Sequence, residues 1–158
     1  MPALLPPDLR PRLAALAVAV ALLAACSRHP VGPARTFGAY EAKAVTTAES
    51  ARSSVETVRL ASEAGDDHDG FGPYLSVLVS GREDALAGVQ DTFRSIQSPD
   101  EGGDALGDEL DGLLGSALSH VTEIRTALRR GQLAGLRDVA APLVDDSAAL
   151  ERFVEDHG

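Results

Sequence analysis

Residues 104–131 read DALGDELDGLLGSALSHVTEIRTALRRG and carry the clearest structural signal in the chain. Their apolar side chains recur three and four positions apart, at Leu106, Leu110, Leu113, Ala117, Val121, Ile124 and Leu128. This spacing is typical of a helix that buries one face. Arg129 and Arg130 follow in the last turn, where positive charge suits the helix dipole, and Gly131 favours termination. The stretch therefore predicts a long amphipathic helix.

Three further segments show the same periodicity. The segment that stops at Gly65 has a largely alanine face, made by Phe37, Tyr40, Ala44, Ala48, Ala51, Val55 and Val58. The next stops before Ser98-Pro99 and presents Leu75, Leu78, Ala85 or Leu86, Val89, Phe93 and Ile96. The last presents Leu133, Leu136, Ala140, Leu143, Ser147, Leu150 and Val154. Each pattern predicts one helix.

Local signals modify these helices at three places. Arg82 interrupts the second stripe, and we expect its side chain to extend outward. The third helix is expected to begin within Ser98-Pro99-Asp100-Glu101, which has the form of a capping box, or a few residues later. The fourth stripe keeps its phase through Pro142, so we expect one helix with a kink before that residue.

Four helices joined by short links favour an all-α fold, an antiparallel up-down-up-down four-helix bundle over residues 36–158. Short links force consecutive helices to be antiparallel neighbours. A looser three-helix arrangement, with the last helix split at Pro142, is the main alternative. No segment shows the alternation of a β-strand.

The first 25 residues have the layout of a secretory signal peptide. Arg10 and Arg12 precede an apolar run from Leu13 to Ala25, and small residues stand directly before Cys26. The run is shorter than the about 20 residues that a helix needs to cross a ~30 Å hydrocarbon core. We therefore expect residues 1–25 to direct export and then to be removed.

Leu23-Ala24-Ala25-Cys26 resembles the lipobox of bacterial lipoproteins. The resemblance implies that the Cys26 thiol takes a diacylglycerol group and that cleavage makes this cysteine the first residue. The alternatives are a chance cysteine after an ordinary signal peptide and a buried thiol. Cys26 is the only cysteine of the chain, so an intramolecular disulfide is excluded.

Residues 26–35 are expected to form the lipidated cysteine and a flexible tether, because Pro30, Gly32 and Pro33 break regular structure there. The chain has a formal net charge of −10, which argues against nucleic acid or an anionic membrane surface as its direct ligand. Its Ala-, Gly-, Arg- and Asp-rich composition is similar to that of high-GC genomes such as those of actinobacteria. In such a cell the lipid would hold the domain at the outer face of the cell membrane.

No metal, cofactor or catalytic site is predicted. Asp66-Asp67-His68-Asp69-Gly70 fails as an EF-hand loop, since Gly65 and Ser76 stand where ligands are needed. We interpret it as a solvated acidic loop, with a weak divalent-cation site as the alternative. His120 near Glu123 lacks the repeated motif of di-iron bundles and is interpreted as a surface histidine. The sequence has no nucleophile motif, so an enzyme is not expected.

Topology suggests one interaction surface. In an alternating bundle the links after Gly65 and after Gly131 lie together, which would place Arg129 and Arg130 beside Phe71 and Tyr74 at an exposed tip. Aromatic residues and arginine are enriched in binding hot spots. The alternative is a surface ion-pair cluster with rings that plug the core.

The function expected from these features is a non-enzymatic, lipid-anchored, extracytoplasmic helical bundle that interacts with an envelope protein. A solute- or metal-binding lipoprotein is the alternative class. It would need a concave pocket of about 300 Å³ or more with convergent polar groups.

Overall fold

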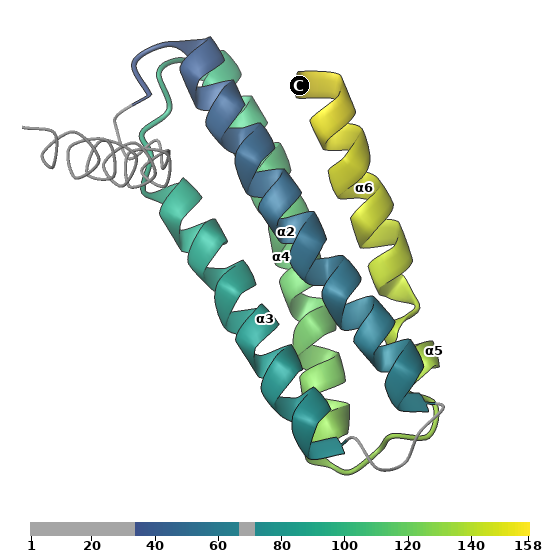
Figure 1. Cartoon of the computed structure of the whole chain (residues 1–158). Helices are drawn as coiled ribbons and strands as arrows, with labels where there is room; N and C mark the ends of the chain where they lie inside the picture. The colour runs from purple at the N-terminus through teal and green to yellow at the C-terminus, as the bar shows by residue number, and fades with distance from the viewer. Residues whose placement is uncertain (1–33, 67–71) are drawn as a thin grey trace, which may run out of the picture. The chain divides into compact units, whose positions relative to one another are not determined.

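The computed structural model describes residues 34–66 and 72–158. These residues contain no strand, and their helices are α2 (Phe37–Asp66), α3 (Gly72–Arg94), α4 (Glu101–Arg129), α5 (Leu136–Ala140) and α6 (Pro142–His157) (Figure 1). The four longer helices pack together, which confirms the prediction of an all-α bundle. The expected signal peptide, Cys26 and most of the tether lie outside the described residues. Among the described helices none is long and apolar enough to cross a membrane.

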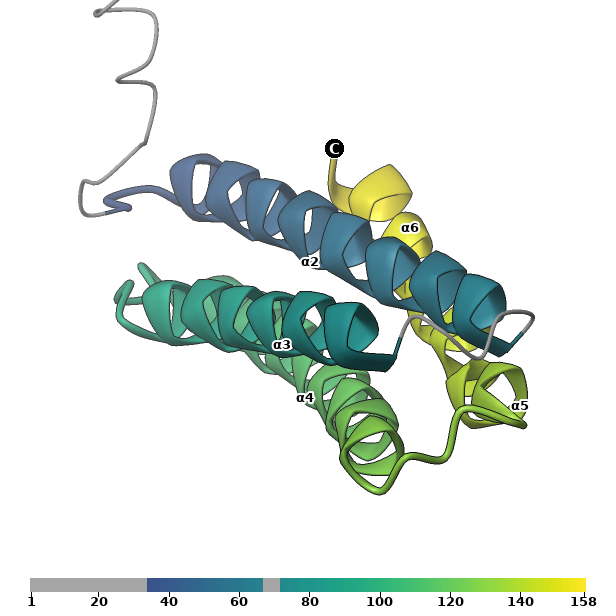
Figure 2. The ribbon, with the colours of Figure 1, turned by 60° about the horizontal axis from the view of Figure 1, so that its bottom comes forward.

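Two helices form the centre of the bundle. α2 packs against α3, α4, α5 and α6, and α4 likewise contacts every other described helix. α3 and α6 lie on opposite flanks and do not touch one another (Figure 2). This arrangement leaves α3 with two neighbours, α2 and α4, so a broad outer arc of α3 is not covered by the described part of the chain.

The core joins a small-residue helix to a large-residue helix. Ala44, Ala48 and Ala51 of α2 are fully buried, as are Leu110 and Leu114 of α4. Alanine side chains let the backbone of α2 approach its neighbours closely, and the leucines fill the remaining space. The predicted core faces of these two helices are therefore confirmed in outline.

The sequence placed one core position incorrectly in α2 and one in α4, and it left one in α3 open; Phe37, predicted for the α2 stripe, is exposed. Leu114 is fully buried, whereas Leu113, the residue predicted for the stripe, is only partly buried. In α3 Leu86 is buried and the alternative Ala85 is exposed. Two adjacent apolar residues fit a helical period equally well. Which of them is buried depends on where the neighbouring helices pack.

The helix ends follow local hydrogen bonding. Asp100 caps α4, because its side chain accepts a hydrogen bond of 2.9 Å from the Gly103 backbone nitrogen. The capping box that began at Ser98 is therefore wrong in detail: the Ser98 hydroxyl instead donates to the Asp100 carbonyl oxygen at 2.8 Å. Gly131 follows α4 with φ of 69°, the left-handed conformation expected for a terminating glycine.

The last segment is two helices rather than one kinked helix. The break falls at Ala141, directly before Pro142, as predicted. However, α5 is only five residues long and starts at Leu136, after Leu133. Gly135 has φ of 81°, so the chain turns sharply before α5 can begin.

We predict that the fold requires glycine at position 107 of α4, because the side chain of Tyr40 packs directly against it. A Cβ at Gly107 would lie 2.6 Å from the Tyr40 hydroxyl oxygen, whereas a Cβ at Gly112 would meet no atom within 4 Å. Gly107→Ala should lower the free energy of unfolding by about 1–3 kcal/mol. Gly112→Ala should raise it by about 0.5–1 kcal/mol. Urea unfolding measures both changes. If Tyr40→Phe, added to Gly107→Ala, does not restore the lost stability, the assigned contact between Tyr40 and Gly107 is wrong.

Candidate interaction surface

The charged side chains of α2 gather on the side that faces α6. Arg52, Glu56, Arg59 and Glu63 follow one another at helical spacing. Arg52 pairs with Glu151 of α6 at 2.7 Å, and Arg59 pairs with Glu56 at 3.0 Å and Glu63 at 2.6 Å. This concentration of charge leaves one exposed carboxylate, Glu49, at the edge of the outward arc of α2.

The outward arcs of α2 and α3 form what we call the carboxylate-free face. Its α2 members are exposed and uncharged: Ala42, Thr46, Ser50, Ser53, Leu60 and Ala64. Its α3 members are equally exposed and uncharged: Tyr74, Val77, Gly81, Ala85, Gly88 and Thr92.

The two arcs border one another because α2 and α3 lie side by side (Figures 1 and 2). By helical position, Lys43 and Arg82 fall on the sides of α2 and α3 that adjoin, so the charges at this seam are basic. Glu49 on the α6 side and Asp84 on the α4 side mark the outer edges of the face. In a chain of net charge −10, a surface without carboxylates repels another acidic protein less than a carboxylate-bearing one does.

Large apolar side chains are exposed at one end of this face. Leu60 is 54% exposed, Tyr74 is 64% exposed and Val77 is 74% exposed. Leu60 lies near the end of α2 and the other two near the start of α3. Exposed side chains of this size are the part of the face that a partner would cover with the largest gain in buried apolar area.

The glycines of the face have no structural requirement within the bundle. A Cβ on Gly81 or Gly88 would meet no atom within 4 Å. Glycine in a helix interior costs roughly 0.5–1 kcal/mol relative to alanine. Their small size therefore lowers helix stability while keeping this surface flat enough for another helix to approach closely.

The structure describes three of the four predicted tip residues. Tyr74 belongs to the carboxylate-free face, whereas Arg129 and Arg130 are exposed at the end of α4. Phe71 lies outside the described residues. The segment after α4 does reach the end of α2, because the Gly135 backbone nitrogen donates a 2.6 Å hydrogen bond to Asp66. A joint tip surface with the arginines stays a prediction.

A polar cluster that the sequence did not reveal joins α4 to α6. The Asp146 carboxylate is 8% exposed, accepts a 2.8 Å hydrogen bond from the Ser116 hydroxyl and lies 2.7 Å from His120 Nδ1. His120 is therefore partly covered rather than a free surface histidine. Ser116 donates to the acid and not to the imidazole, so the order required to activate a serine nucleophile is absent from this cluster. The arrangement instead fixes α6 on α4.

A second polar cluster lies beside Arg82, where the apolar stripe of α3 is interrupted. Arg82 is exposed, as expected, and the adjacent Glu83 turns toward α4. There it pairs with Arg125 and accepts a 2.8 Å hydrogen bond from the Thr122 hydroxyl. Neither partner could be identified from periodicity, because both lie on another helix, and Thr122 is 39 residues further along the chain.

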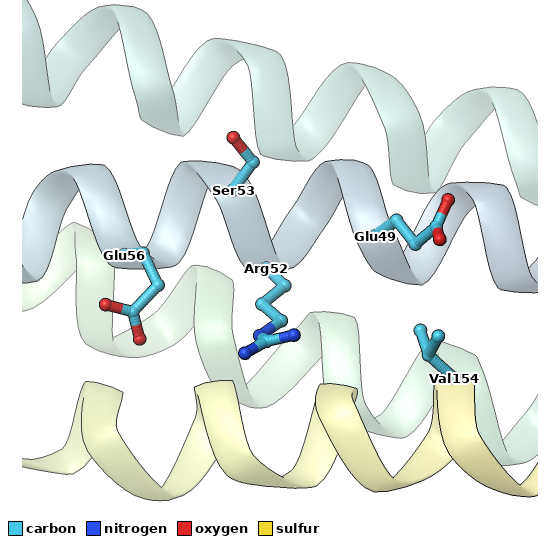
Figure 3. A pocket seen from close by; sticks show the side chains of 5 residues that line it. All are labelled: Glu49, Arg52, Ser53, Glu56 and Val154. Atoms are coloured by element: carbon cyan, nitrogen blue, oxygen red, sulfur yellow. The ribbon is translucent and has the colours of Figure 1, made fainter.

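A groove of about 330 Å³ runs between α2 and α6 and is lined by Glu49, Arg52, Ser53, Glu56 and Val154 (Figure 3). Arg52 and Glu56 point toward α6, and Ser53 points away from it. The pKa of Glu56 lies below its ordinary value, first because of the Ser147 hydroxyl and then because of Arg59. Arg52 and Glu56 thus bind other protein groups rather than converge on a solute. No three potential ligands in the described ranges are placed to hold a metal ion.

Asp111 of α4 anchors the end of α3. Arg94 donates hydrogen bonds of 2.6 and 2.8 Å to its two oxygens, and the Gln90 amide donates one of 3.0 Å. These bonds, with that of Arg94 first, hold the pKa of Asp111 below its ordinary value. The group therefore stabilises the fold above its unfolded-state pKa, and this contribution disappears as the pH falls through its folded-state pKa.

We expect Asp111→Asn to be less stable than the natural chain at neutral pH, with a difference that shrinks in strong acid. Thermal unfolding at a series of pH values measures both proteins. A difference that stays constant from neutral to strongly acidic pH would contradict the assigned ion pair.

Comparison with known proteins returned no relative. No protein-family model and no curated protein matches the sequence, and no solved structure matches the fold. The function is therefore argued from the residues of this chain.

Proposed function

We propose that the chain is a non-enzymatic lipoprotein whose helical bundle is held at the outer face of the cell membrane by lipid on Cys26 and docks an envelope protein. The lipobox-like Leu23-Ala24-Ala25-Cys26 supports the anchor. The carboxylate-free face is the observation that carries the docking role. It combines exposed apolar side chains with small residues on two adjacent helices.

We further propose the up-down-up-down direction of the helices. Tyr40 at the start of α2 packs on Phe93 at the end of α3, with ring centroids 5.2 Å apart. At the opposite ends, Gly65 near the end of α2 packs directly against Leu75 near the start of α3. His157 at the end of α6 lies 3.5 Å from Glu41. These contacts support antiparallel neighbours, with the start of α2 at the opposite end of the bundle from Leu60, Tyr74 and Val77.

This placement gives the two ends of the bundle different roles. The tether would join the bundle at the start of α2, near the membrane. The apolar end of the carboxylate-free face would then point away from the lipid, where an envelope protein could reach it. A helix of the partner laid along the small residues could approach to about 8–10 Å between axes, the usual packing distance.

The solute-binding alternative has weaker support. The groove between α2 and α6 has a volume of about 330 Å³, but its Arg52 and Glu56 already pair with protein groups. A solute would have to break these pairs.

The docking role is tested by adding charge to the face without disturbing the core. Gly81→Glu with Gly88→Glu places two carboxylates where a Cβ meets no other atom, and Gly112→Glu does the same on exposed α4. All three changes replace helical glycines, so none should lower thermal stability. Envelope proteins that co-purify with the natural chain and with Gly112→Glu should be lost from the double variant. Equal recovery from all three would contradict docking at this face.

A further inference from the structure

A pocket of about 270 Å³ lies where the start of α2, the end of α3 and the start of α4 meet. Phe93 and Ile96 supply apolar wall, and Tyr40 supplies a phenol. Asp104 and Asp108 of α4 supply carboxylates. The pocket therefore combines an apolar surface with negative charge.

The carboxylates of the pocket are unequally neutralised. Asp104, Asp108 and Asp111 share one face of α4 at positions i, i+4 and i+7. Asp111 is neutralised by Arg94, which also lines the pocket. In the described part of the chain no cation pairs with Asp104 or Asp108. Like charges one helical turn apart repel one another, and the positive end of the helix dipole reaches only the first turn, which contains Asp104.

The Tyr40 hydroxyl is a third oxygen in this pocket without a protein partner. Tyr40 is only 4% exposed, and its oxygen rests on Gly107, between the two aspartates in sequence. No described group hydrogen bonds to it, and it is not among the buried unpartnered atoms, so the oxygen is open to solvent in the pocket. Burial first, and the charges of Asp104 and Asp108 second, raise the pKa of Tyr40.

We propose that this pocket binds an alkylammonium group. An ammonium carries three N–H donors and no acceptor, which suits two carboxylates and a phenol oxygen. The alkyl stem would lie on the apolar wall of Phe93 and Ile96. A bare Ca²⁺ ion takes 6–8 oxygen ligands, more than these residues supply. The ammonium could belong to a lysine side chain of a protein or to a small free amine, and this proposal does not depend on the carboxylate-free face.

The chain provides its own optical probe for this pocket. It has no tryptophan and two tyrosines, so Tyr74→Phe leaves Tyr40 as the only tyrosine reporter. Full-length Tyr74→Phe protein in detergent is titrated with butylammonium chloride at constant ionic strength, with potassium chloride as the salt control. We expect a saturable change in tyrosine fluorescence with butylammonium and none with potassium.

Neutralising the carboxylates identifies the site. Asp104→Asn with Asp108→Asn should weaken butylammonium binding at least about tenfold, since hydrogen bonds to charged groups are the stronger ones. It should also lower the pKa of Tyr40 toward its ordinary value. Glu101→Gln, in the first turn of the same helix but not lining the pocket, should bind like the parent.

Two outcomes separate the sources of the amine, and two overturn the proposal. Equal binding of butylammonium and of lysine blocked at its α-amino and carboxyl groups assigns the pocket to a lysine side chain. Binding of butylammonium alone assigns it to a small free amine. A fluorescence response no larger than that to potassium chloride overturns the proposal, as does unweakened binding by a folded Asp104→Asn, Asp108→Asn variant.

Discussion

Leu114→Ala is expected to lower the free energy of unfolding by about 2–5 kcal/mol, the range for a fully buried leucine. Leu114 has no exposed surface and belongs to α4, the helix that contacts all the others. Its removal would leave a cavity that the alanine face of α2 cannot fill, because those side chains have no further atoms to move into it. Denaturant unfolding followed by circular dichroism gives the value.

Leu113→Ala is the matched control for this prediction. The two leucines are adjacent on one helix and share composition and propensity, but Leu113 is only partly buried. Its truncation should cost clearly less than that of Leu114. Equal losses, or a larger loss at Leu113, would mean that α4 is rotated from the described position and that the periodicity of the sequence was the better guide.

Cys26→Ser is expected to abolish incorporation of labelled fatty acid completely. The thiolate is the only strong nucleophile among the residues around the proposed cleavage site, and the chain has no other cysteine. A single acyl chain binds membranes only marginally, whereas a diacylglycerol group adds two chains, so lipid on Cys26 would be enough to anchor the natural chain.

Ser27→Ala is the control for the anchoring experiment, because it changes the neighbouring residue and keeps the thiol. It should be labelled as fully as the natural chain. Labelling of the Cys26→Ser protein would show that the lipid, if present, is carried elsewhere. If the natural chain takes up no labelled fatty acid, its resemblance to a lipobox is a coincidence.

The periodicity of the sequence was sufficient to predict the helices but not their rotation. Apolar spacing located α2 and α4, and Pro142 located the break between α5 and α6. It could not choose between Leu113 and Leu114, because a step of one residue changes the helical angle by about 100° and only the neighbouring helices decide which angle is covered. The early turn before α5 depends on the positive φ of Gly135, which many glycines do not adopt.

The sequence could not predict the long-range polar contacts either, because its periodicity does not show which residues of two helices face one another. His120 and Asp146 are 26 residues apart, and nothing near either residue in the sequence marks the other as its partner. The carboxylate-free face could have been found in part, since Val77, Gly81 and Gly88 recur at helical spacing on α3. Its boundaries required knowing that α3 has two neighbours and that the charges of α2 turn toward α6.

Site-specific photo-crosslinking in intact cells tests the docking role most directly. A photoreactive residue replaces Gly81 on the carboxylate-free face or, in a separate protein, Gly112 on the exposed side of α4. Both positions are helical and open, so the fold and the amount of protein should be equal. We predict one discrete crosslinked envelope protein from position 81 and none from position 112. Equal crosslinking from both positions, or none from position 81, would contradict the account.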